Sequence, residues 1–155
     1  MEPVRYETRD TAFKNVAPST DPRVRLDRRL PVVGFVSKHK WIPGVGPVTV
    51  DGEGVGATRS AELDPATGFA GRITESLDAF DERAKYFRYS IVGDSPIPIA
   101  DYVAEMSVLA QSDDSCEVTW QSDWRPSGDL SEEELLNAFQ TLYDVSLENV
   151  RAACE

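Results

Sequence analysis

The stretch that decides the fold is Ser131–Cys154, SEEELLNAFQTLYDVSLENVRAAC, which has the pattern of one long helix. Ser131 and Glu134 have the spacing of a capping box, and the three glutamates of the first turn favour the positive end of the helix dipole. Apolar residues then recur every three or four positions, at Leu135, Leu136, Phe139, Leu142, Tyr143, Leu147 and Val150. At 1.5 Å per residue the helix would be about 33 Å long, and its apolar face needs a partner.

The region before this helix has the alternating pattern of antiparallel strands. Mostly apolar residues that would face the core occupy every second position, and turn residues separate the segments. These segments are 57–63, 69–80, 85–92, 100–109 and 116–124. A shorter strand is expected at 48–50, followed by the Asp51-Gly52 turn of a hairpin. We therefore predict an α+β fold, in which a curved antiparallel sheet of six to seven strands wraps around the C-terminal helix. The predicted domain spans residues 31–155.

Residues 1–30 do not share this pattern. Acidic and basic residues alternate there, prolines occur at positions 3, 18 and 22, and apolar residues are sparse. We expect a divergent or poorly ordered segment, with a short strand at Tyr6 or at 24–26 as the alternative. Residues 30–41 have enough apolar content for a short helix or turn against the core.

Composition excludes several classes of function. The chain of 155 residues has 16 basic and 27 acidic residues and a formal charge of −11, which argues against nucleic acid or an anionic membrane surface as the main partner. No apolar run is long enough for membrane insertion, and the N-terminus lacks the apolar core of a signal peptide. The two cysteines do not form a disulfide framework, so we expect the reducing setting of the cytoplasm. The single histidine, His39, provides no metal site, and no cofactor motif is present.

Arg59 and Glu75 are the most informative positions, because both fall on the otherwise apolar side of their strands. A buried charge is costly unless it is paired. Two interpretations stay open: an ion pair that fixes the sheet, or the polar anchor of a ligand cavity. Glu75 is also the candidate for general acid–base catalysis, which would need a shifted pKa.

Aromatic side chains with polar tips share this inner face, at Tyr89, Tyr102, Trp120, Trp124 and Tyr143. Such a surface suits a flat apolar ligand with one or two polar groups, although Trp120 is also expected as plain core. Trp41 and Ile97 should border the mouth of the cavity, with Trp41 as a packing anchor or a gate. The predicted ligand-binding set is Arg59, Glu75, Tyr89, Tyr102, Trp120, Phe139, Leu142 and Tyr143.

Six short motifs carry a family resemblance: Trp41-Ile42-Pro43-Gly44, GVGATR at 54–59, ITESLD at 73–78, Tyr89-Ser90-Ile91, PIADY at 98–102 and Val118-Thr119-Trp120. In this order, over residues 33–153, the chain resembles the helix-grip superfamily, also called START-like or Bet v 1-like, with its polyketide cyclase/dehydrase and lipid-transfer proteins. The resemblance implies seven antiparallel strands gripping the C-terminal helix, and two short helices at the mouth of a cavity. Two departures stand out, since residues 1–30 do not show the family's first strand and helix, and Ile42 replaces a frequent histidine.

We therefore expect a protein that binds an apolar or amphipathic small molecule in a cavity between sheet and helix, without metal or cofactor. The alternative is an enzyme of the polyketide cyclase or dehydratase type that uses Glu75 with a tyrosine for proton transfer. A third possibility is an interaction protein whose cavity is filled by side chains. The sequence makes no prediction of the oligomeric state.

Overall fold

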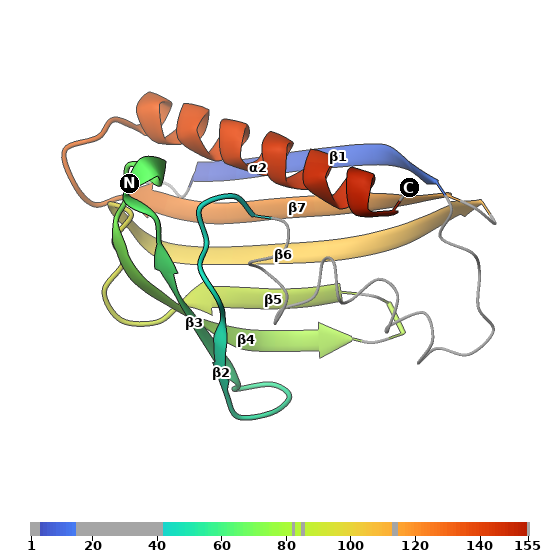
Figure 1. The fold of residues 1–155 in the computed structure, drawn as a ribbon, viewed down its shortest axis with the longest axis horizontal. Coiled ribbons are helices and arrows are strands. Elements are labelled where there is room, and N and C mark those ends of the chain that lie inside the picture. The colour runs from blue at the N-terminus through green and yellow to red at the C-terminus, as the bar shows by residue number, and fades with distance from the viewer. Residues whose placement is uncertain (1–3, 15–41, 82, 85, 113–114, 155) are drawn as a thin grey trace.

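The computed structural model describes residues 4–14, 42–81, 83–84, 86–112 and 115–154. Its strands are β1 (Val4–Lys14), β2 (Thr49–Asp51), β3 (Thr58–Leu63), β4 (Gly71–Asp81), β5 (Tyr86–Ile91), β6 (Ile99–Ser112) and β7 (Ser115–Pro126). A short 3-10 turn, η2 (Pro65–Thr67), and the long helix α2 (Glu132–Cys154) complete the described elements. The strands form one antiparallel sheet in the order β1-β7-β6-β5-β4-β3-β2. This confirms the predicted α+β fold (Figure 1).

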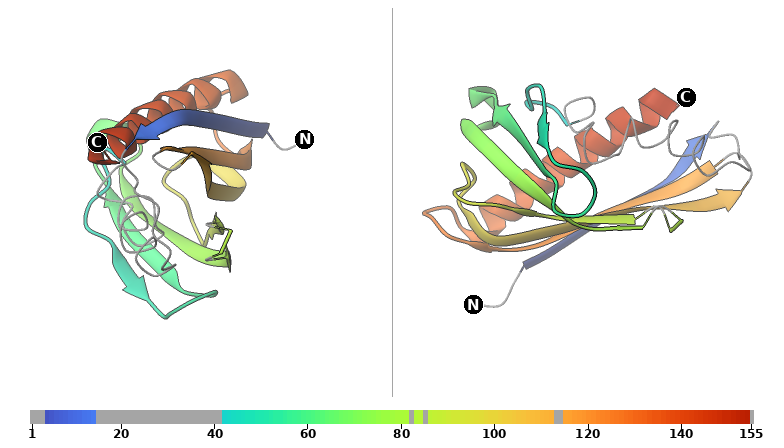
Figure 2. Two further views of the ribbon diagram at one scale, coloured as in Figure 1. Left: turned by 90° about the vertical axis from the view of Figure 1, so that its right-hand side faces the viewer. Right: turned by 90° about the horizontal axis from the view of Figure 1, so that it is seen from below.

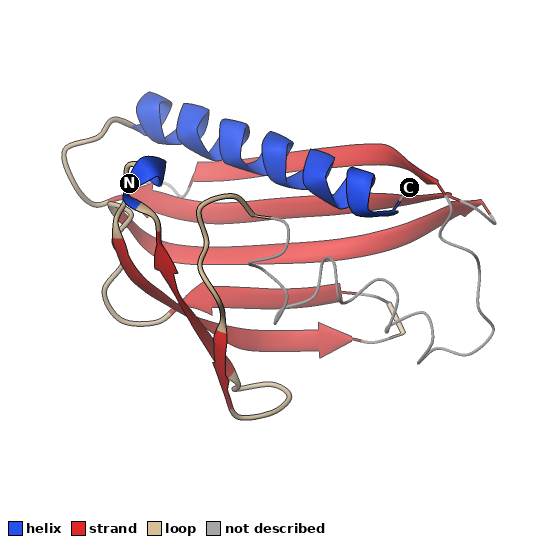
Figure 3. Cartoon of the chain, in the orientation of Figure 1, coloured by secondary structure: helices blue, strands red, loops and turns tan. Residues whose placement is uncertain are grey.

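The sheet is curved, and its concave side is turned toward α2 (Figure 2). The helix packs mainly on β1 and β7, while β2, β3 and β4 lie at the other end of the curve. Figure 3 shows the long helix crossing one side of the strands. The helix therefore covers one end of the concave face, and the inward residues of β3 to β5 lie along the rest of it.

Helix α2 begins with the capping box that the sequence predicts. The backbone N–H of Glu134 donates to Ser131 Oγ at 3.1 Å, and that of Ser131 donates to Glu134 Oε2 at 2.8 Å. Each bond satisfies a donor that the first turn would leave without a partner. The buried side of the helix comprises Leu135, Phe139, Tyr143, Ser146 and Leu147. Within the described residues, no helix combines the length and apolar character needed to cross a membrane.

The alternation predicted for the strands is present in the burial of their side chains. On β3, Arg59, Ala61 and Leu63 are buried while Glu62 is exposed. The same period follows on the next four strands, since successive side chains of a strand point to opposite faces. The inward residues there are Ile73, Glu75 and Leu77, then Phe87 and Tyr89, then Tyr102, Ala104 and Met106, and finally Trp120, Ser122 and Trp124.

Strand β1 corrects the prediction for the N-terminal region. Residues 4–14 pair along β7, from Val4 opposite Trp124 to Lys14 opposite Ser115. The expectation of an irregular segment over 1–30 is therefore wrong for these residues, and the alternative of a strand containing Tyr6 holds. The strand expected at 24–26 and the helix or turn expected at 30–41 lie outside the described residues.

Candidate functional site

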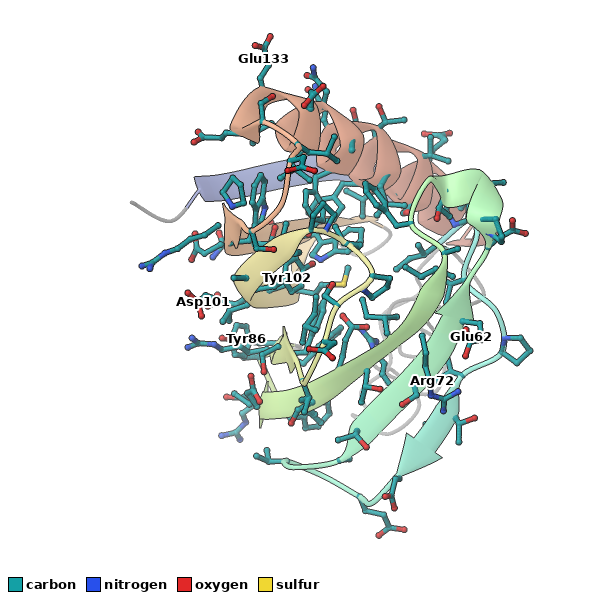
Figure 4. The ribbon with its side chains drawn as sticks, turned by 90° about the vertical axis from the view of Figure 1, so that its left-hand side faces the viewer. Glu62, Arg72, Tyr86, Asp101, Tyr102 and Glu133 are labelled. Atoms are coloured by element: carbon teal, nitrogen blue, oxygen red, sulfur yellow. The ribbon has the colours of Figure 1, made fainter. Side chains whose placement is uncertain are left out.

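The predicted ion pair between Arg59 and Glu75 is present. The two residues are directly opposite in the register of β3 and β4, and Arg59 Nε lies 3.1 Å from Glu75 Oε1. Both side chains are only 3% exposed. A second pair on the same strands, Arg72 with Glu62, faces outward with side chains 55% and 66% exposed (Figure 4). Strand alternation thus places one ion pair inside the curve and one outside it.

Arg59 also contacts the next inward side chain of the sheet. Its guanidinium carbon lies 4.6 Å from the ring centroid of Tyr89 on β5, which is cation–π geometry. The hydroxyl of Tyr89 accepts a 3.0 Å hydrogen bond from Trp120 Nε1 and lies 3.4 Å from the hydroxyl of Tyr102. Tyr89 therefore extends the polar contacts from the ion pair toward the helix.

The contacts reach α2 at Tyr143. Its hydroxyl lies 2.8 Å from that of Tyr102 and donates to Ser122 Oγ at 2.9 Å, while its ring stacks on Trp120 with centroids 3.5 Å apart. We call the connected residues the polar line, and they come from six different elements: Glu75, Arg59, Tyr89, Tyr102, Tyr143 and Ser122. The line joins the sheet to the helix through the interior.

Burial determines the protonation of the three tyrosines. Removal from water raises the pKa of Tyr89, Tyr102 and Tyr143 above the usual 10.0, because the phenolate is the charged form. At neutral pH the three hydroxyls are therefore uncharged hydrogen-bond donors and acceptors. Combined with the opposite charges of Arg59 and Glu75, they give the polar line no formal net charge.

Phe139 of α2 lies where the polar line meets the rest of the core. Its ring stacks on Tyr102 with centroids 6.0 Å apart, meets Tyr143 edge-on at 5.8 Å, and lies 5.0 Å from the ring of Trp124. Trp124 is fully buried, and its Nε1 has no hydrogen-bond partner in the described part of the chain. A buried donor without an acceptor destabilises a fold by about 1–3 kcal/mol.

A groove of about 680 Å³ lies between α2 and the connection from β3 to β4. Its lining is mostly apolar and combines three separate segments: Pro43 and Gly44, then Asp64, Ala66, Thr67 and Phe69, then Asn137, Ala138, Thr141, Leu142 and Val145. A small cavity of about 20 Å³ lies beside it, lined by Phe69, Ile97, Leu135, Ala138 and Phe139. The groove and the small cavity share Phe69 and Ala138.

Another hollow, of about 720 Å³, lies at the connection between β5 and β6. Its lining is largely polar and includes the exposed carboxylates of Asp94 and Asp101. Such a surface keeps its water and does not favour an apolar molecule. Of these two hollows in the described part of the chain, the groove beside α2 is the better candidate for an apolar ligand.

The structure brings most of the predicted site residues together. Arg59, Glu75, Tyr89, Tyr102 and Tyr143 belong to the polar line, and Trp120 donates to it. Phe139 lies between the line and the small cavity, Leu142 lines the groove, and Ile97 lines the small cavity. Trp41 lies outside the described residues.

The sequence interpretation did not identify most of the groove. Residues from 43–44 and 64–69 are distant in the chain from α2, so no local pattern predicts that they meet. The helix does carry one signal, a second stripe at helical spacing beside the buried one: Ala138, Thr141, Leu142 and Val145.

Comparisons with known proteins agree with this architecture. XoxI of Bacillus cereus superposes with a TM-score of 0.76 at 22% identity, covering 96% of this chain and 94% of that one. An uncharacterised protein of Bacillus thuringiensis gives 0.76 at 21% identity, covering 97% and 98%. A Thermobifida fusca protein solved by NMR gives 0.66 at 26% identity, covering 97% and 91%. No curated protein matches the chain.

A family model also matches this chain. It is described as polyketide cyclase / dehydrase and lipid transport, and it covers residues 34–155. That match spans most of the sheet and all of α2, which confirms the resemblance to the helix-grip superfamily. The chain belongs to the polyketide cyclase / dehydrase and lipid transport family.

Proposed function

We propose that the protein binds an apolar or amphipathic small molecule in the groove between α2 and the η2 connection, without metal or cofactor. The observation that carries this proposal is the groove itself. Its volume of about 680 Å³ falls within the roughly 300–1,000 Å³ of small-molecule sites, and its lining is mainly apolar with a few polar groups. The lipid-transport description of the family agrees with such a ligand.

The polar groups of the groove would orient the molecule. Asn137 and Thr141 come from α2, whereas Asp64 and Thr67 come from the η2 connection. Asp64 Oδ1 accepts from the backbone N–H of Ala66 at 2.8 Å, and Thr67 Oγ1 donates to the backbone oxygen of Asp64 at 2.7 Å. These bonds give the η2 wall a defined shape, so it is largely preformed for a ligand.

One side of the groove adjoins the interior of the protein. Phe69 and Ala138 belong to both the groove and the small cavity, and Phe139, which lines the small cavity, also stacks on Tyr102. An amphipathic molecule would keep its apolar part in the groove and direct its polar end inward, past Phe139. The interior residues predicted from the sequence would then contact only that end.

The enzyme alternative assigns proton transfer to Glu75 and a tyrosine. The contacts favour binding over this role, because the carboxylate of Glu75 is engaged with Arg59 and both side chains are almost fully buried. A Glu75→Gln variant separates the two functions, since an enzyme would lose turnover and keep its ligand. The third possibility, a filled interior without a ligand, predicts no ligand response at all.

Filling the groove tests the proposal directly. We expect Ala138→Trp, which places an indole in the groove, to weaken binding of the neutral dye Nile red at least about tenfold, or about 1.4 kcal/mol. The matched control is Gln140→Trp, an exposed position on α2 that does not line the groove. It should bind like the unmodified protein. Equal affinities for the two variants, or no dye binding by the unmodified protein, would reject the groove as the site.

A further inference from the structure

Two tryptophans of β7 face the same concave side, but their indole N–H groups differ. Trp120 Nε1 donates a 3.0 Å hydrogen bond to the hydroxyl of Tyr89. Trp124 is equally inaccessible, yet no described residue accepts a hydrogen bond from its Nε1. Buried indole N–H groups normally have a partner. Trp124 is therefore an unused donor inside the protein.

This donor lies close to the inner end of the candidate site. The ring of Trp124 is 5.0 Å from that of Phe139, and Phe139 is one wall of the small cavity. At about 20 Å³ the cavity has room for one water-sized group, but every residue that lines it is apolar. The cavity and the groove adjoin at Phe69 and Ala138, which line both. A ligand atom that enters the cavity contacts Phe139, whose ring also lies against Trp124.

We propose that Trp124 is a ligand-binding residue, whose indole N–H donates a hydrogen bond to an oxygen atom at the inner end of the bound molecule. This inference rests on the proposed function. The apolar part of the ligand occupies the groove, and its last group passes Phe69 and Ala138. A shift of the Phe139 ring then opens the way to Nε1. Trp124 thereby selects a molecule that carries an oxygen acceptor over a pure hydrocarbon.

The accepting oxygen belongs to an uncharged group, such as a ketone, ester or ether. Among the described residues that line the groove and the small cavity, the single charged one is Asp64, which is acidic. A carboxylate or phosphate would lose its water there without gaining a cation, which strongly opposes burial. A ketone loses less hydration free energy than a charged group and gains a hydrogen bond from the indole N–H.

Three probes of equal chain length test both parts of the inference: 2-undecanone, undecane and undecanoate. In competition against Nile red, we expect 2-undecanone to bind most tightly and undecanoate to compete least. Trp124→Phe keeps an aromatic ring and removes the N–H. It should weaken 2-undecanone roughly threefold to tenfold, the usual effect of one hydrogen bond, and leave undecane unchanged.

Trp120→Phe is the matched comparison, because it removes an indole N–H that already has an acceptor. Any effect of this variant should be the same for all three probes. If Trp124→Phe changes 2-undecanone and undecane alike, Trp124 is not the donor, although groove binding stands. If undecanoate binds as tightly as 2-undecanone, the uncharged class is wrong. If no probe displaces the dye, the proposed function itself fails.

A second measurement does not depend on the folding of a variant. In the unmodified protein, the indole ¹⁵N–¹H resonance of Trp124 should move downfield when 2-undecanone is added and stay in place with undecane. A resonance that responds equally to both probes, or to neither, overturns the assignment.

Discussion

Two regions of the interior differ in how their polar groups are bonded. Along the polar line, charges and hydroxyls from six elements are bonded to one another. Beside α2 and η2, the protein leaves a groove, a small cavity and an indole N–H without an acceptor. Bonded polar groups stabilise one arrangement of the core, whereas open space and an unused donor are what a ligand needs. We infer that stability depends mainly on the polar line and binding on the groove.

The largest expected effect concerns the ion pair of the polar line. Glu75→Leu removes the carboxylate that faces a buried guanidinium, and should lower the free energy of unfolding by about 3–5 kcal/mol. The double variant Arg59→Leu/Glu75→Leu should recover part of this loss, because neither charge remains. Glu62→Leu is the control, since it breaks the exposed pair of the same strands and should change stability by less than about 1 kcal/mol. Urea unfolding measures all three, and similar losses for Glu75→Leu and Glu62→Leu would contradict the contrast.

Alkaline pH should lower the stability that the tyrosines of the polar line provide. Unfolded tyrosines lose their protons near pH 10.0, whereas the raised pKa values of Tyr89, Tyr102 and Tyr143 keep the folded ones protonated to higher pH. Stability is therefore complete below that pH and falls above it, by about 1.4 kcal/mol per tyrosine for each pH unit until the folded groups titrate. Urea unfolding at about pH 9 and pH 11 measures the slope.

The contribution of one tyrosine to this pH dependence of stability can be tested by removing its hydroxyl. Tyr143→Phe should reduce the alkaline dependence by up to about 1.4 kcal/mol per pH unit, because one of the tyrosines with a raised pKa is lost. Tyr86→Phe is the comparison: burial and the nearby Glu105 also raise the pKa of Tyr86, but this residue is less buried and lies outside the polar line, so its loss should reduce the dependence less. A variant slope equal to that of the unmodified protein would show that Tyr143 does not contribute.

The smallest expected effect concerns the wall of the groove. Gly44 has φ of +78°, and a Cβ there would collide with Thr67 Cγ2 of the η2 connection. Gly44→Ala should therefore cost about 1–2 kcal/mol in stability and weaken Nile red binding as the wall moves. Gly54→Ala separates the two causes, because Gly54 also has a positive φ, +66°, but open space around it. It should lose only the backbone part, about 1 kcal/mol, and keep the affinity for the dye. If both variants bind the dye equally well, Gly44 does not shape the site.

The parts of the fold that depend on local pattern could be predicted from the sequence. Period-2 alternation identifies five of the strands, and the capping box of Ser131 and Glu134 locates the start of α2. The same alternation places Arg59 and Glu75 inside, where the structure has them. Strand β1 was predicted only as an alternative, a short strand at Tyr6, because its sequence, VRYETRDTAFK, contains few apolar residues and much alternating charge. Its position depends on pairing with β7, which lies about a hundred residues later.

The parts of the site that depend on tertiary geometry could not be predicted. Alternation tells which side of a strand Tyr89 and Tyr102 face, but the meeting of their hydroxyls with that of Tyr143 depends on how far the sheet curves. The groove likewise combines Gly44, Phe69 and Ala138, which have no common local pattern. Nor does any sequence pattern distinguish the bonded Trp120 from the unbonded Trp124, because both occupy the same parity of one strand.

The pairing of β1 with β7 has a consequence for the order of folding. During synthesis, residues 4–14 emerge well before their partner strand and the helix that packs on both, which follow more than a hundred residues later. Contacts between such distant segments make folding slow, because a long loop must close before they form. We expect β1 to remain without its strand partner while the ribosome makes the middle of the chain, and the sheet edge at β7 to close last. Release of the chain before α2 is made would therefore leave the unpaired edges of β1 and β7 open to self-association.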